Sequence, residues 1–114
     1  MQIKINQKQF MEYYDVFGSQ KMMFLWEEFL SCSFQKWSQL PDVDWQQKRQ
    51  YFHNWRSSSK VFGMEDFALL CQKIEEKIIK KRYSEAEKLL FEAKQLYEDS
   101  TQQVVAFFEE KQKD

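Results

Sequence analysis

Residues 65–81, EDFALLCQKIEEKIIKK, have the apolar spacing of a helix that is buried on one side. Large apolar side chains recur at steps of three or four residues, at Phe67, Leu70, Cys71, Ile74 and Ile78. Because an α-helix has 3.6 residues per turn, these side chains form a single stripe. The stretch therefore predicts an amphipathic helix that packs its stripe against other helices.

The same spacing extends to both sides of this stretch. Helices are predicted over residues 7–17, 19–39, 42–62 (or from 44), 65–81 and 84–108. Gly18, Pro41 and Gly63 interrupt the pattern between them. The predicted N-caps are Asn6, Ser19, Asp42 or Asp44, and Ser84 in a capping box with Glu87. Short connections favour antiparallel neighbours, so the predicted fold is all-α: an up-down antiparallel four-helix bundle with an additional short N-terminal helix.

Two further helices have predicted buried sides. On the second helix this side comprises Met22, Trp26, Phe29, Ser33, Phe34, Trp37 and Leu40. On the last helix it comprises Leu89, Leu90, Ala93, Leu96, Tyr97, Val104 and Phe108. Together with the stripe above, these residues are expected to form one shared core.

The composition narrows the class of protein. The 114 residues are 43% hydrophobic and 18% aromatic, which argues for one folded domain, residues 1–114, and against disorder. Two glycines and one proline are too few for a turn-rich β-fold and leave no glycine-rich loop for a nucleotide phosphate. The formal net charge of -1 lacks the basic excess that is typical of nucleic-acid binding.

The two cysteines, Cys32 and Cys71, lie in apolar helical patterns and are expected to pack as small hydrophobes. They are too few for a zinc site, so no metal or cofactor is predicted. No apolar run reaches the roughly 20 residues of a membrane helix, and residues 1–6 lack a signal-peptide core. A cytoplasmic protein without membrane insertion is expected, and Met1 with the lysine-rich end favours a protein that stands alone.

His53, the single histidine, is predicted to point into solvent. Each helical residue advances by about 100°, which puts the apolar residues of its helix on the opposite side. The residues on that opposite, core-facing side are Tyr51, Phe52, Trp55, Ser59 and Phe62. The imidazole should therefore lie outside the core.

Cations and a small residue share the side of the helix that carries His53. They are Arg49, Arg56, Ser57 and Lys60. Like charges on one helix face destabilise the helix mildly, so an anion would stabilise this face. Ser57 removes bulk beside the imidazole, which allows another protein to approach. Taken alone, a surface histidine is most simply a solvated polar residue; this setting favours transient phosphoryl storage.

The run that begins at His53 resembles the histidine-containing phosphotransfer (HPt) domain family. The family pattern has an apolar residue two positions after the histidine, a lysine or arginine at three, usually glycine at four, a small residue at six, and glycine at ten. An apolar residue follows at fourteen, often cysteine at eighteen, and Gln or Glu at twenty-two. Here those positions hold Trp55, Arg56, Ser57, Ser59, Gly63, Phe67, Cys71 and Glu75. The resemblance covers about residues 19–108; serine replaces the usual glycine at Ser57, and Trp55 is larger than the usual leucine.

The resemblance implies a phosphorelay intermediate of a two-component system. His53 would accept a phosphoryl group from a receiver-domain aspartate and pass it to another. Arg56 and Lys60 would stabilise the transferred group, and Glu75 would hold the other ring nitrogen. Ser57, Arg49 and Gly63 would belong to the surface on which a receiver domain docks.

The implied partners are a response-regulator receiver domain and a hybrid sensor histidine kinase, with this chain as a monomer. It would not be an enzyme itself, and Mg²⁺ would belong to the receiver alone. One alternative is a degenerate HPt-like helical adaptor that binds a histidine kinase or receiver without being phosphorylated. Another is a plain interaction bundle whose histidine is incidental. The intact set of His53, Arg56 and Gly63 favours the relay.

Overall fold

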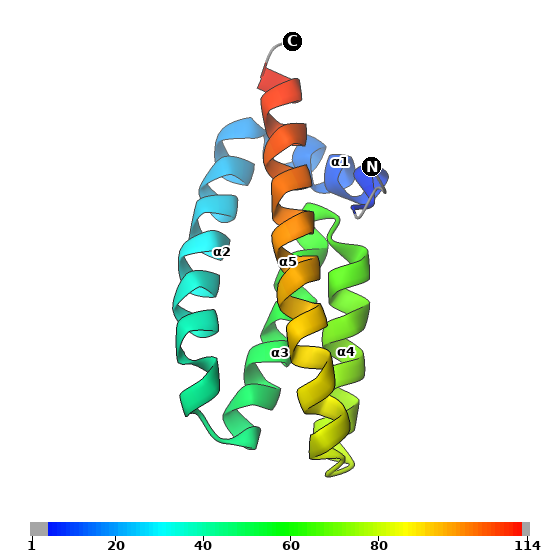
Figure 1. Cartoon of the computed structure of the whole chain (residues 1–114). Coiled ribbons are helices and arrows are strands. Elements are labelled where there is room, and N and C mark those ends of the chain that lie inside the picture. Colours follow the sequence, from blue (N-terminus) through cyan, green and yellow to red (C-terminus); the bar gives the residue numbers. More distant parts are fainter. Residues whose placement is uncertain (1–4, 113–114) are drawn as a thin grey trace.

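The computed structural model describes residues 5–112, all of whose regular structure is helical (Figure 1). Residues 1–4 and 113–114 of the predicted domain lie outside this range. Five α-helices follow one another: α1 (Gln7–Phe17), α2 (Ser19–Gln39), α3 (Trp45–Ser59), α4 (Glu65–Ile79) and α5 (Tyr83–Gln112). Two 3₁₀ turns, η1 (Leu40–Asp42) and η2 (Lys60–Phe62), flank α3. No helix among the described residues is both long and apolar enough to cross a membrane.

Two of the predicted helix caps are present. The backbone N–H of Gln9 donates to Asn6 Oδ1 over 3.1 Å at the start of α1. At the start of α3, the N–H of Gln47 donates to Asp44 Oδ1 over 2.8 Å. Of the two caps predicted for this helix, Asp44 is therefore the one that is present. Asp42 belongs to η1 instead.

The other two predicted caps are wrong. Ser19 is already the first residue of α2, and Gly18 precedes it without a capping side chain. Ser84 lies inside α5, which begins one residue earlier. The reason is the tight turn after α4, where Lys81 adopts a left-handed conformation (φ 60°) and the N–H of Arg82 bonds the Lys77 carbonyl over 2.8 Å. The chain re-enters a helix before Ser84 is reached.

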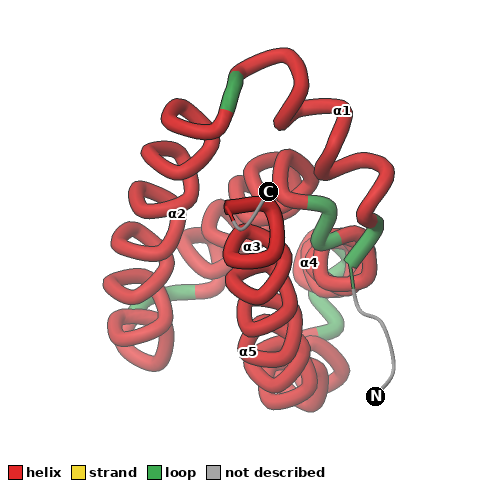
Figure 2. Tube along the Cα trace, turned by 90° about the horizontal axis from the view of Figure 1, so that it is seen from above, coloured by secondary structure: helices red, strands yellow, loops and turns green. Residues whose placement is uncertain are grey.

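The helices pack around a core that is dominated by aromatic rings. Helix α4 packs closely against α3 and α5, whereas the backbone of α2 stands further from the others (Figures 1 and 2). Large side chains fill that distance: the ring centroids of Trp37 and Trp55 are 4.3 Å apart, and those of Trp26 and Phe62 are 4.9 Å apart. Aromatic pairs of this kind add to the stabilisation that comes from burial alone.

Most predicted core positions are buried, and two predictions on α2 are wrong. Phe34 is 78% exposed, and Cys32 is also exposed. Both are direct neighbours of the buried Ser33, and neighbouring helical residues point about 100° apart. The core contacts only one side of α2, so these two side chains fall on its flanks.

Gly63 fixes the position of α1 and is not part of an exposed docking surface. It is buried with φ 73°, and its carbonyl accepts the backbone N–H of Asn6 over 2.6 Å. A Cβ atom at this position would lie 2.3 Å from the Asn6 carbonyl oxygen. The prediction that Gly63 contacts a receiver is therefore corrected: the start of α1 covers it.

Candidate functional site

His53 lies in the second half of α3 with 44% of its side chain exposed. Tyr51, Trp55 and Phe62 are buried on the other side of the same segment. The predicted orientation is therefore confirmed. Because α3 packs against α4 on one flank, the partly exposed ring also meets a side chain of that helix.

That side chain is Glu75 of α4, whose carboxylate is buried. His53 Nδ1 and Glu75 Oε2 are 3.0 Å apart. An ionised carboxylate only accepts hydrogen bonds, so with Glu75 ionised this contact favours the tautomer in which Nδ1 carries the proton. Nε2 then keeps its lone pair, and no described residue bonds to it. The contact sets the tautomer and the orientation of the ring.

Two arginines of α3 share the same carboxylate. Arg49 Nη1 is 3.3 Å from Glu75 Oε2, and Arg56 Nη1 is 3.7 Å from Oε1. Burying a carboxylate is costly unless cations and hydrogen bonds compensate for the lost water. The guanidinium groups supply that compensation while about a third of each arginine side chain stays exposed.

The sequence predicts Arg49 as part of the surface on which a receiver docks, and it does not predict the contact of Arg49 with Glu75. It lies one turn before His53, so the helical pattern placed it on the correct face. Its partner comes from another helix, 26 residues away in the chain. Arg49 Nε also donates to Gln46 Oε1 over 3.2 Å, which holds the guanidinium from a second side.

Lys60 and Ser57 lie near this cluster without joining it. Both are exposed on the α3–η2 segment, and neither side chain forms a hydrogen bond or ion pair with the described residues. The structure thus brings together His53, Glu75, Arg49 and Arg56 around one carboxylate. Lys60 and Ser57 lie on the adjoining surface.

The two thiols differ in their surroundings. Cys71 is buried one turn before Glu75, and burial, with a smaller contribution from the Glu75 charge, raises the pKa of its thiol well above the usual value. It therefore stays protonated at neutral pH, which makes it a poor nucleophile. Exposed Cys32 instead lines a cavity between α2 and α3.

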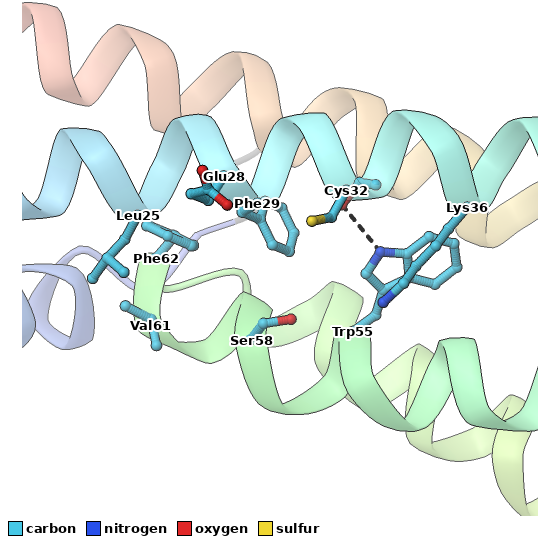
Figure 3. A pocket seen from close by; sticks show the side chains of 10 residues that line it. Leu25, Glu28, Phe29, Cys32, Lys36, Trp55, Ser58, Val61 and Phe62 are labelled. Atoms are coloured by element: carbon cyan, nitrogen blue, oxygen red, sulfur yellow. Dashed lines mark hydrogen bonds between the residues drawn. The ribbon is translucent and has the colours of Figure 1, made fainter.

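This cavity has a volume of about 300 Å³ (Figure 3). Phe29, Trp55 and Phe62 line it with apolar surface, and Glu28 and Lys36 of α2 also border it. The indole N–H of Trp55 donates to Ser33 Oγ over 3.1 Å, which connects the two helices. Ser58 of α3 also lines the cavity, so this surface adjoins the face that carries Ser57 and His53.

No protein-family model, curated protein or solved structure is significantly similar to this chain. The site is therefore interpreted from its own geometry and chemistry.

Proposed function

We propose that this protein is a phosphorelay intermediate that carries a phosphoryl group on His53. The observation that carries the proposal is the hydrogen bond between His53 Nδ1 and the buried Glu75 carboxylate, which leaves Nε2 unpartnered among residues 5–112. In this proposal α2–α5 act as an up-down antiparallel four-helix bundle of the HPt type, and α1 is the added N-terminal helix.

The transfer step follows from the state of the ring. The Nε2 lone pair attacks the phosphorus of an aspartyl phosphate on a receiver domain. The P–N bond forms, the P–O bond to the aspartate breaks, and the aspartate leaves as a carboxylate. The Nδ1 proton stays in place, so the ring gains positive charge, which the carboxylate 3.0 Å away stabilises. The reverse step passes the group to the aspartate of a second receiver.

The three cations near His53 have different roles in this proposal. Arg56 makes the longest contact with Glu75 and is partly exposed, so its guanidinium can turn toward the phosphoryl oxygens. Lys60, one turn further on, adds an exposed ammonium. Arg49, held by both Glu75 and Gln46, keeps the buried carboxylate compensated. Positioned cations of this kind stabilise the charge of a transferring phosphoryl group.

The proposed partners are the receiver domains of a hybrid sensor histidine kinase and of a response regulator. A receiver docks over His53 on the exposed parts of α2 and α3, where Ser57 adds little bulk. Mg²⁺ belongs to the receiver, and the chain acts as a cytoplasmic monomer without enzymatic activity of its own.

Label transfer tests this function. Receiver domains that carry ³²P on their aspartate are mixed in turn with the wild type and with His53→Gln. At least one receiver is expected to label the wild type, in a bond that acid cleaves and base preserves, and to leave His53→Gln unlabelled. Equal labelling of the two proteins would contradict the proposal. Receiver binding without any label would favour the adaptor alternative instead.

A further inference from the structure

Residues of α2, η1, α3 and α5 line a cavity of about 490 Å³. The chain passes from α2 into α3 at one end of the molecule, beside the first half of α5 (Figure 1). The lining of the cavity includes Trp37, Trp45, Lys48, Glu87, Phe91 and Lys94. The volume falls in the range of small-molecule sites. None of the residues that contact His53 takes part, so the cavity is separate from the proposed phosphoryl site.

Lys48 gives this cavity a buried positive charge. Its relative exposure is 9%, and its Nζ donates to the Val43 carbonyl oxygen over 2.6 Å. No carboxylate of the described residues forms an ion pair with it, and its ammonium lies 5.0 Å from the centroid of the Trp45 ring. Because this largely buried lysine has no carboxylate partner, an anion in the cavity would supply a counter-charge for its ammonium.

A second ammonium borders the same space. Lys94 Nζ lies 4.9 Å from the centroid of the Trp37 ring, and its contact with Glu98 is 3.9 Å long. Glu87 is the acidic residue of the lining, so the two lysines leave it with a positive excess. The charge of the cavity is complementary to an anion.

The rest of the lining favours a flat apolar group. Phe91 is 79% exposed at the cavity, although it is one of the largest apolar side chains of α5. Trp45, which also lines the cavity, stacks on Tyr83 with ring centroids 5.0 Å apart. Trp37 adds another aromatic ring to the lining, while its indole N–H is buried and has no hydrogen-bond partner among the described residues.

From these observations we propose that the cavity binds a small aromatic carboxylate. The ring of the ligand packs against Trp37, Trp45 and Phe91, and its carboxylate is balanced by Lys48 and Lys94. The ligand thereby covers Phe91 and supplies the counter-charge that Lys48 lacks. Neither the ligand nor the site depends on phosphorylation of His53.

An NMR titration of the full chain with 2-naphthoate tests this site. Saturable shifts of the indole N–H signals of Trp37 and Trp45 are expected, with no shift of the His53 amide. Lys94→Gln and Lys48→Gln should each weaken binding by about tenfold, as expected for the loss of a hydrogen bond to a charged group. Lys88→Gln is the matched control, because Lys88 is an exposed cation of α5 that does not line the cavity.

Neutral 2-naphthalenemethanol and cationic 2-naphthylmethylammonium test the role of charge, and both should bind more weakly than 2-naphthoate. The proposal is overturned if either binds as tightly, or if the naphthoate shifts do not saturate. It is also overturned if Lys88→Gln weakens binding as much as Lys94→Gln does. Lys94 is partly exposed, so Lys94→Gln should stay folded and provide a test even if Lys48→Gln does not fold.

Discussion

Gly63→Ala is expected to lower the free energy of unfolding by about 2–5 kcal/mol, the sum of a left-handed backbone penalty and an overpacking penalty. The backbone penalty arises because φ is 73°. The overpacking penalty arises because the new methyl group would lie 2.3 Å from the carbonyl oxygen of Asn6. The measurement is chemical denaturation followed by circular dichroism.

Gly18→Ala is a control that strains the backbone without creating a clash, at a ψ of 164° compared with 15° for Gly63. Gly18 also has a positive φ, 85°, but no other atom lies within 4 Å of its would-be Cβ. It should lose only the cost of the strained backbone, about 1–3 kcal/mol. Gly63→Ala should in addition speed hydrogen exchange at the Asn6 amide, which bonds the Gly63 carbonyl. Unchanged stability of Gly63→Ala together with an unchanged Asn6 amide would contradict the account of how α1 is held.

Trp55→Ala should cost about 3–5 kcal/mol of stability, as truncation of a buried tryptophan typically does. Trp55 is 1% exposed, stacks on Trp37 at 4.3 Å, and donates a hydrogen bond to Ser33. The change leaves a cavity where α2 meets α3 and removes the donor to Ser33. Thermal and chemical denaturation of the purified variant measure the loss.

Phe34→Ala is the control for Trp55→Ala, because it also removes a large aromatic ring from the α2–α3 half of the molecule. Phe34 is 78% exposed, so the free energy of unfolding should change by no more than about 0.5 kcal/mol. If the two changes lowered the free energy of unfolding by similar amounts, this would contradict the role of the aromatic core in holding α2.

The sequence predicted best what depends on local helical geometry. The spacing around His53 gave its exposed side correctly, because 100° per residue is a property of every α-helix. Asn6 and Asp44 were found as caps for the same reason, since a cap acts within three residues of its own position. The resemblance to the HPt family added one longer-range expectation, the contact between Glu75 and the imidazole, and the two groups are in fact hydrogen-bonded.

What the sequence missed depends on contacts between segments that are distant in the chain. The pairing of Arg49 with Glu75 requires the relative position of α3 and α4. The burial of Gly63 depends on where the N-terminal segment crosses η2. Lys48 is an exception, because its ammonium contacts the nearby Val43 carbonyl and Trp45 ring; its burial was missed because a lysine in a helix is usually solvated. The 3.6-residue spacing of apolar side chains along a helix does not predict these contacts.

The wrong expectation at Phe34 has a different origin. The sequence pattern assigns six positions of α2 to the core, including the adjacent Ser33 and Phe34. A helix whose backbone stands away from its neighbours buries a narrower stripe, and the small Ser33 faces inward because it accepts the Trp55 indole hydrogen bond. The polar residue therefore occupies the core and the aromatic residue lies outside it.

The central claim is that Glu75 holds Nδ1 so that Nε2 of His53 is the phosphoryl acceptor. The most direct measurement is NMR of the protein with a ¹⁵N-labelled imidazole ring after treatment with phosphoramidate, a small-molecule donor that needs no partner protein. The account predicts a single phosphohistidine with the phosphoryl group on Nε2 and the proton on Nδ1, formed much more slowly in Glu75→Ala. Phosphorylation at Nδ1, or an imidazole that stays unmodified in the folded wild type, would contradict it.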